Sequence, residues 1–218
     1  GTPTDATAPA VPTGLGAGVV SAGARLNLSW AANSEADLSG YRLYRATYAG
    51  SVGSKVLAAA VAAPGTTAQD AGLANGTTYY YQLTARDATL NESGATSEVT
   101  GAPQDTTAPG VPVGLGVWVV AAGQRLNVSW TANTEGDLKE YRLRRAVSPG
   151  SWVSKTDLAT VLAPGTTHQD AGLGNGTTYY YMLRARDASA NESAESGEAS
   201  GTPQDTTAPA AAGGVGVT

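Results

Sequence analysis

The sequence predicts an all-β protein that consists of two tandem seven-stranded antiparallel β-sandwiches. The first observation is an internal repeat: residues 1–100 align with residues 101–200 without a gap and are identical at 62 of 100 positions, and each copy has the usual size of one domain. The second is a composition of 41% hydrophobic and only 14% charged residues, which is typical of a folded protein. The third is a series of short alternating segments, separated by turn signals about 8–12 residues apart.

A short acidic linker begins each copy of the repeat and occurs a third time near the end of the chain. It follows the pattern G-x-P-x-D-x-T-A-P and places Asp5, Asp105 and Asp205 one hundred residues apart. Since the chain starts at Gly1 with no Met and no signal peptide, we expect it to be a segment of a longer polypeptide. The expected parts are a first domain at residues 1–103, a second at 104–203, and the linker and first strand of a third repeat at 204–218.

The third linker is followed by no strand that could pair with it. An isolated strand rich in Ala and Gly cannot offset its ordering entropy. We therefore expect residues 204–218 to be held by a neighbouring copy of the protein, at an open sheet edge or at an acidic pole.

The first half of each copy contains three expected strands. Residues 14–20 follow a proline, which suits a strand at the edge of a sheet. Residues 25–30 alternate strictly, and this pattern places Leu26, Leu28 and Trp30 on one buried face. Residues 41–43 resume the alternation, with the first and last of the three side chains pointing inward.

The second half of each copy supplies the remaining strands. Residues 48–63 differ most between the copies, so we expect a variable loop and a short edge strand there. Residues 66–70 form the next strand, and an Asn-Gly turn at residues 75–76 leads into residues 77–85, which are β-branched and aromatic. A short strand near residues 95–100 completes seven.

Three motifs resemble the fibronectin type III domain, an immunoglobulin-like sandwich, in the form found in secreted bacterial proteins. The resemblance covers nearly all of both copies and implies a tyrosine corner at Tyr79 and Tyr179. The chain departs from the family pattern at Asn75, where the family frequently has proline. The chain also contains no Arg-Gly-Asp tripeptide, so the resemblance does not imply integrin adhesion. The motifs are Leu26-x-Leu28-x-Trp30, Gly40-Tyr41-Arg42-Leu43 and Leu73-x-x-x-Thr77-x-Tyr79.

Composition excludes several classes of function. The net charge of -5 and the scattered basic residues argue against nucleic acid as a partner. No apolar run reaches the length of a membrane span, and the absence of Cys excludes disulfides and thiolate chemistry. The only His, His168, has Ala68 as its counterpart, and we interpret it as a solvated surface residue. We therefore expect a protein that is not an enzyme.

Two further sets of residues have a functional and a structural interpretation. The aromatic residues Tyr44, Tyr48, Trp118 and Trp152 each occur in one copy only, where an exposed ring could stack on a sugar or pack on a neighbouring domain. The N-x-S/T sequons permit glycan attachment, although Asn- and Thr-rich turns also produce such sequons by chance. The sequon positions are Asn27, Asn75, Asn91, Asn127, Asn175 and Asn191.

Carboxylates are the candidate metal ligands. Alternating strand direction brings the linker and two loops to one pole of each sandwich. Like charges that converge there are expected to raise one another's pKa, and oxygen ligands of this kind are what Ca²⁺ prefers. The alternative is that these side chains accept backbone N–H bonds as Asx-turns. The candidates are Asp5, Glu35, Asp37, Asp87 and Asn91 in the first copy, Asp105, Glu135, Asp137, Asp187 and Asn191 in the second, and Asp205 in the third linker.

Two functions remain open from the sequence. The first is a non-catalytic spacer or filament segment of a secreted bacterial repeat protein, whose partners are neighbouring repeats or copies, stiffened by Ca²⁺ at the acidic poles. The second is a carbohydrate-binding or adhesion module that is accessory to an extracellular enzyme, with the unpaired aromatic residues as the platform and a polysaccharide as the partner. Both place the protein outside the cell or on its surface.

Overall fold

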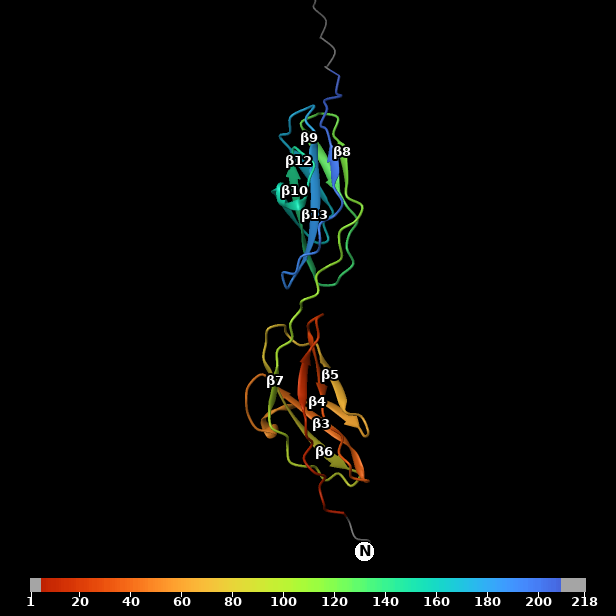
Figure 1. Cartoon of the computed structure of the whole chain (residues 1–218), viewed down its shortest axis with the longest axis vertical. Coiled ribbons are helices and arrows are strands. Elements are labelled where there is room, and N and C mark those ends of the chain that lie inside the picture. The colour runs from red at the N-terminus through yellow and green to blue at the C-terminus, as the bar shows by residue number, and fades with distance from the viewer. Residues whose placement is uncertain (1–4, 209–218) are drawn as a thin grey trace, which may run out of the picture. The chain divides into compact units, whose positions relative to one another are not determined.

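The computed structural model describes residues 5–208 of the chain. The chain divides into two compact units, Gly1–Thr107 and Ala108–Thr218. Each unit is a sandwich of one three-stranded and one four-stranded sheet (Figure 1), and neighbouring strands are antiparallel throughout. The predicted all-β fold with two seven-stranded sandwiches is therefore confirmed.

The first unit contains strands β1 to β7 and one turn of 3-10 helix, η1. Its sheets have the orders β1-β2-β5 and β4-β3-β6-β7. The bounds are β1 Gly16–Val19, β2 Arg25–Ser29, β3 Leu38–Ala46, η1 Val52–Ser54, β4 Val56–Ala62, β5 Thr67–Ala71, β6 Tyr79–Asp87 and β7 Val99–Gly101.

The second unit repeats this arrangement with strands β8 to β14. Its sheets have the orders β12-β9-β8 and β11-β10-β13-β14. The bounds are β8 Gly116–Val119, β9 Arg125–Ser129, β10 Leu138–Ala146, η2 Trp152–Ser154, β11 Thr156–Leu162, β12 Thr167–Ala171, β13 Tyr179–Asp187 and β14 Ala199–Gly201.

The core lies between the two sheets of each unit and confirms the predicted strand faces. Leu26, Leu28 and Trp30 are buried, and the Trp30 ring meets the Tyr41 ring edge to face, with 5.3 Å between centroids. Trp130 packs in the same way in the second unit. Both tryptophans are thus core residues, as their alternation predicts.

The tyrosine corner is present in both units. The backbone N–H of Ala74 donates to the Tyr79 hydroxyl oxygen at 3.0 Å, and the N–H of Gly174 donates to that of Tyr179 at 3.0 Å. Each bond fixes the turn that leads into one of the two nine-residue strands of the four-stranded sheet.

One buried cluster ties the two sheets of the first unit together. Asp70 on β5 accepts from Arg45 on β3 at 2.6 Å and from the Tyr81 hydroxyl on β6 at 2.7 Å. Because its carboxylate is nearly inaccessible to solvent, these donors replace the water it loses on folding. Asp170 has the same partners, Arg145 and Tyr181, in the second unit.

The last strand of each unit is shorter than expected, with three residues in place of six. Before β7, the hydroxyl groups of Ser93 and Thr96 accept from the backbone N–H groups of Ala85 and Leu83, at 2.9 and 3.1 Å. These side chains take part of the pairing that a regular strand would supply, so β7 begins only at residue 99. The β3 strand is longer than expected because it is paired on both sides.

The second and third linkers are paired with the units that precede them. Asp105 forms a bridge with Ala22, in the turn between β1 and β2, and the N–H of Thr106 donates to the Ser21 carbonyl at 2.8 Å. Asp205 forms the same bridge with Ala122. The described start of the third linker is thus held by the chain's own second unit, whereas the expectation for residues 209–218 lies outside the described residues.

Candidate functional site

The structure brings three of the predicted carboxylates together at one pole of the first unit. Asp5 comes from the linker, Asp37 from the loop before β3, and Asp87 from the end of β6. One carboxylate oxygen of each lies within 4.8 Å of the other two. Oxygen atoms at this spacing could hold a metal ion.

The same carboxylates are also engaged in hydrogen bonds within the protein. Asp87 accepts from the backbone N–H groups of Thr89 and Asn91 at 2.9 and 2.8 Å, and from the Asn91 amide at 2.8 Å. Asp5 accepts from the N–H of Thr7 at 2.9 Å. The Asx-turn interpretation of Asp87 is therefore correct as a description of its contacts. Asn91 enters the cluster as a hydrogen-bond donor.

The expected rise in pKa is wrong for Asp87. Burial of this residue, which is 1% exposed, favours the neutral carboxyl, but the bonds from Asn91 and Thr89 outweigh it and lower the pKa. Hydrogen bonds that stabilise the charged form are the deciding factor.

Glu35 is not part of the group formed by the three aspartates. Its Oε1 accepts from the N–H of Ala10 at 2.7 Å, and this backbone bond is the main reason for its lowered pKa. Glu135 likewise accepts from the N–H of Gly110, which lowers its pKa. Both glutamates fasten the incoming chain to their own unit.

The second unit repeats the two loop positions of the cluster. Asp187 accepts from the backbone and the amide of Asn191 at 2.8 and 2.9 Å, and the Asp137 carbonyl accepts from the N–H of Ala188 at 3.0 Å. Asp105 corresponds to Asp5 in the repeat, and its backbone is paired with the first unit. Its role beside Asp137 and Asp187, like that of Asp205 in a third cluster, stays a prediction.

The predicted aromatic platform separates into buried and exposed rings. Trp152 is only 5% exposed, and the guanidinium groups of Arg144 and Arg184 lie over its ring, 4.6 and 4.7 Å from the centroid. The proposed exposure of Trp152 is therefore wrong, because the ring is buried and packs against two cations. Tyr44 is half-buried and donates to Glu92 at 2.9 Å. Tyr48 and Trp118 are exposed.

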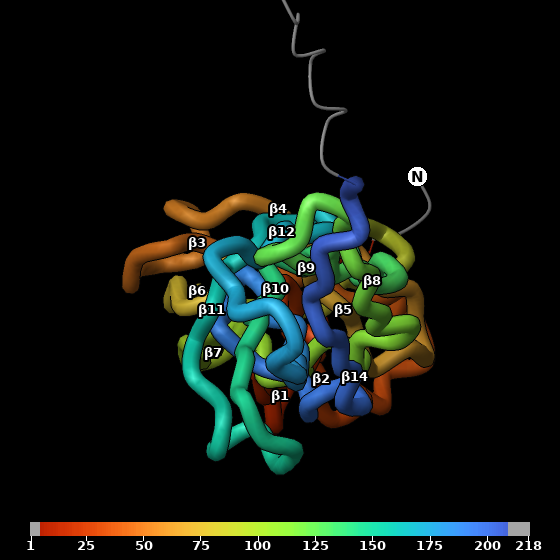
Figure 2. The backbone as a smooth tube through the Cα atoms, turned by 90° about the horizontal axis from the view of Figure 1, so that it is seen from above, coloured from red at the N-terminus to blue at the C-terminus, as the bar shows by residue number. Residues whose placement is uncertain are grey.

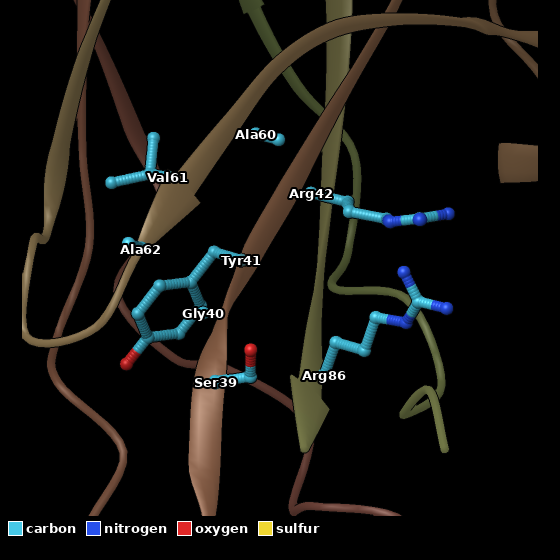
Figure 3. A pocket seen from close by; sticks show the side chains of 8 residues that line it. All are labelled: Ser39, Gly40, Tyr41, Arg42, Ala60, Val61, Ala62 and Arg86. Atoms are coloured by element: carbon cyan, nitrogen blue, oxygen red, sulfur yellow. The ribbon is translucent and has the colours of Figure 1, made fainter. Parts of the chain in front are cut away.

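A hollow on the first unit offers no catalytic arrangement. Its wall consists of β3, β4 and the end of β6, and Figure 3 shows Arg42 and Arg86 on one side and Tyr41 on the other. Arg42 forms an ion pair with Glu92 at 3.6 Å. In the second unit Glu140 stands in place of Gly40 and pairs with Arg186 at 3.2 Å. His168 lies elsewhere, on β12, and is partly buried, contrary to its interpretation as a solvated residue.

A buried lysine is a feature that the sequence analysis missed. The Lys55 side chain has no exposed surface and pairs with Glu98 at 2.6 Å, and the Lys155 side chain pairs with Glu198 in the same way. Glu98 also accepts from the N–H of Gly50 at 3.1 Å, so the pair closes the variable loop onto the segment before β7. The signal available was that both residues are retained in two copies of a chain with few charges.

Within residues 5–208, the structure contains no helix that is long and apolar enough to cross a membrane.

Comparison with protein families gives no matching family model. The chain is 35% identical to Exoglucanase B of Cellulomonas fimi over 97% of its own length and 18% of that protein. It is 32% identical to Chitinase A1 of Niallia circulans over 89% of its own length and 26% of that protein. The chain therefore spans only a small part of the enzymes it matches.

Two solved structures are also similar to the chain. A two-domain fibronectin type III segment of chicken tenascin is 22% identical, covers 87% of this chain and 97% of its own, and has a TM-score of 0.45. An Fn3-like protein from Clostridium thermocellum is 28% identical over 47% of this chain and 99% of its own, with a TM-score of 0.38. The strand order of each unit, its tyrosine corner, the motifs that carry it and the relatedness to the bacterial enzymes together identify the chain as two tandem fibronectin type III domains.

Proposed function

We propose that the chain is a non-catalytic accessory module of an extracellular, polysaccharide-degrading enzyme. The observation that carries this proposal is the extent of the similarity, which covers 97% of this chain but only 18% of an exoglucanase and 26% of a chitinase. A shared region of that size leaves most of each relative for the catalytic part. Two self-contained sandwiches joined by a short Pro- and Thr-containing linker suit a spacer within such an enzyme.

The test joins the chain to the catalytic domain of an exoglucanase and compares the fusion with the catalytic domain alone. We expect higher activity on insoluble cellulose and unchanged activity on a soluble oligosaccharide, because an accessory module acts on access to the polymer and leaves the chemical step unaltered. The chain alone should release no sugar from either substrate. Equal activity on insoluble cellulose, or sugar release by the chain alone, would contradict the proposal.

We also propose that Ca²⁺ binds the carboxylates of Asp5, Asp37 and Asp87. Their oxygen atoms lie within 4.8 Å of one another, and Ca²⁺ accepts carboxylate and backbone oxygens in flexible geometry. The Asp5 carbonyl, which accepts from the Asn91 amide at 3.1 Å, lies beside the same cluster.

Calorimetric titration with CaCl₂ tests this second proposal. We expect Asp37→Asn to lose binding, because it removes one of the three charged carboxylates. The turn that Asp87 organises should stay intact, since Asp37 contributes no side-chain bond to it. The control is Glu35→Gln, which changes a carboxylate outside the cluster. No heat of binding, or equal binding by Asp37→Asn and the unmodified chain, would show that the cluster is structural only.

A further inference from the structure

The outer face of the three-stranded sheet in the second unit presents an exposed tryptophan. Trp118 on β8 is 54% exposed. Its partner across the ladder is Asn127 on β9, whose partner on β12 is Gln169. Figure 2 shows these three strands in their order β8, β9, β12. Trp118, Asn127 and Gln169 therefore form one row across the sheet.

The indole ring lies along its own strand. A Cβ added to Gly116 would come within 2.7 Å of Cη2 of Trp118 and within 3.1 and 3.3 Å of two further ring carbons. The far edge of the six-membered ring thus lies close to the glycine, which has no Cβ to push the indole away. Because the side chain is 54% exposed, a large part of the ring is open to a stacking ligand.

Hydrogen-bonding groups continue the row beside the ring. The Gln169 amide donates to Asn127 Oδ1 at 3.0 Å. The Asn127 amide nitrogen and the Gln169 carbonyl oxygen have no partner among residues 5–208, and both side chains are exposed. The row on one side consists of Gly116, Ser129 and Thr167 and also carries no charge, whereas the row on the other side contains Arg125, paired with Ala171.

We propose that this face binds an uncharged polysaccharide chain built from β-linked glucose or N-acetylglucosamine units. The apolar face of a pyranose ring stacks on the indole of Trp118, and the sugar hydroxyls reach the amides of Asn127 and Gln169. The two rows without charges complement an uncharged polymer, whereas a polyanion would require more cations than the one arginine, Arg125, of the next row. The proposal rests on the accessory function and assigns to it a ligand and a site.

The first unit has the polar part of this face without the ring. Gln69 donates to Asn27 at 3.0 Å, as in the second unit, but Gly18 stands where Trp118 does. The surface there is a hollow lined by Gly18, Asn27, Ser29, Thr67 and Gln69 among others. A Cβ on Gly18 would make only an ordinary contact of 3.6 Å with the Asn27 carbonyl oxygen, and one on Gly16 would meet nothing within 4 Å. The first unit is therefore a matched control within the same chain.

Calorimetric titration with cellohexaose and chitohexaose, together with depletion by insoluble cellulose and chitin, tests the site. One binding site per chain is expected for at least one of these probes. Trp118→Ala should lower the affinity at least about tenfold, since a lost aromatic contact is of that order, and Trp118→Tyr should retain part of it. Tyr48→Ala, which removes the other exposed aromatic side chain, should bind as the unmodified chain does.

Gly18→Trp is the gain-of-function arm of the same experiment. It should raise the number of sites per chain from one to two, because the first unit already carries the amide pair and leaves room for the ring. Unchanged unfolding temperatures of the Ala, Tyr and Trp variants show that binding, and not folding, has changed. A Trp118→Ala variant that binds as tightly as the unmodified chain would overturn the proposal, as would the absence of binding to every probe.

The outcomes separate this proposal from the accessory function. If the chain binds none of the probes but still raises the activity of the fused exoglucanase domain on insoluble cellulose, the accessory function stands and this site is refuted. Binding that depends on Trp118, combined with no gain in activity, supports the site and refutes the accessory function. Self-association that depends on Trp118, measured by sedimentation, would show that a second copy occupies this face and would also overturn the proposal.

Discussion

Removing the Tyr81 hydroxyl should destabilise the first unit measurably. This group donates to the buried Asp70 carboxylate at 2.7 Å, and Tyr81 is fully buried. In Tyr81→Phe, the Asp70 carboxylate keeps the bond from Arg45 at 2.6 Å but loses the bond from Tyr81. The Asp70 side chain is only 8% exposed. A hydrogen bond to a charged group contributes about 1.5–3 kcal/mol. Because the Arg45 side chain remains in place, we expect a loss at or below the lower end of this range, about 1–2 kcal/mol.

Replacing the carboxylate itself should cost more. Asp70→Ala leaves the Tyr81 hydroxyl buried without its acceptor and removes the partner of Arg45. Breaking a buried ion pair in this way typically costs about 3–5 kcal/mol. Since the Arg45 side chain is 29% exposed and can reach water, we expect about 2–4 kcal/mol. Asp70→Asn, which keeps an acceptor for Tyr81, should lie between the two variants.

Differential scanning calorimetry measures these losses. For a domain of roughly 60–100 residues, 1 kcal/mol lowers the unfolding temperature by about 4–8 °C. Tyr81→Phe should therefore shift the transition of the first unit by about 4–16 °C and leave that of the second unit in place. Tyr181→Phe should show the reverse pattern, because Asp170 has the same partners. Shifts below about 2 °C in both variants would refute the assignment of these bonds as sheet-to-sheet ties.

Three further variants or conditions follow from the contacts described above. Tyr79→Phe should lower the free energy of unfolding by about 1–3 kcal/mol in urea titrations, since the N–H of Ala74 loses its acceptor; a neutral result would mean that the tyrosine corner contributes nothing. Trp152→Ala should destabilise the second unit by about 3–5 kcal/mol and leave polysaccharide binding unchanged, because the ring is buried and packs against two arginines; lost binding without lost stability would contradict this. The bond from Lys55 lowers the pKa of Glu98. The pair therefore stabilises the fold above the unfolded carboxyl pKa of about 4.3, and this contribution disappears as pH falls through the lower folded pKa. In Glu98→Gln, the free energy of unfolding should be lower at neutral pH and should fall less on acidification, as monitored by fluorescence; an unchanged acid profile would show that the pair does not contribute to the acid sensitivity of the fold.

The regular strands could be predicted because their side chains follow a simple period. Leu26, Leu28 and Trp30 alternate with polar residues, and burial of one face of a sheet requires that pattern. The short β7 could not be predicted, because Ser93 and Thr96 replace ladder bonds with their hydroxyl groups. A hydroxyl group that accepts from a distant backbone N–H leaves no periodic signal in the sequence.

The positions of the candidate metal ligands could be predicted from the sequence, but the hydrogen bonds and burial around them could not. Strand direction alone brings Asp5, Asp37 and Asp87 to one pole, and the structure places them there. The lowered pKa of Asp87 depends on donors from Thr89 and Asn91, whose orientation the sequence does not specify. Trp152 was misjudged for a similar reason, because its burial depends on two arginines from separate strands.

The turn between β1 and β2 has a mechanical consequence for the linker that crosses it. Gly23 has a φ of +64°, and a Cβ there would lie 2.7 Å from the Asn75 amide and 2.8 Å from Asp105 Cβ, so glycine lets three segments meet. Asn75, at the position where proline is frequent, accepts from the N–H of Ala24 at 2.7 Å. When the polypeptide is under tension, the contacts of Asp105 with this turn must break before the force reaches the strands of the sheet. Because the Asp105 bridge and the Thr106 N–H bond hold this backbone against the turn, we expect limited proteolysis to cut the linker only after Thr106.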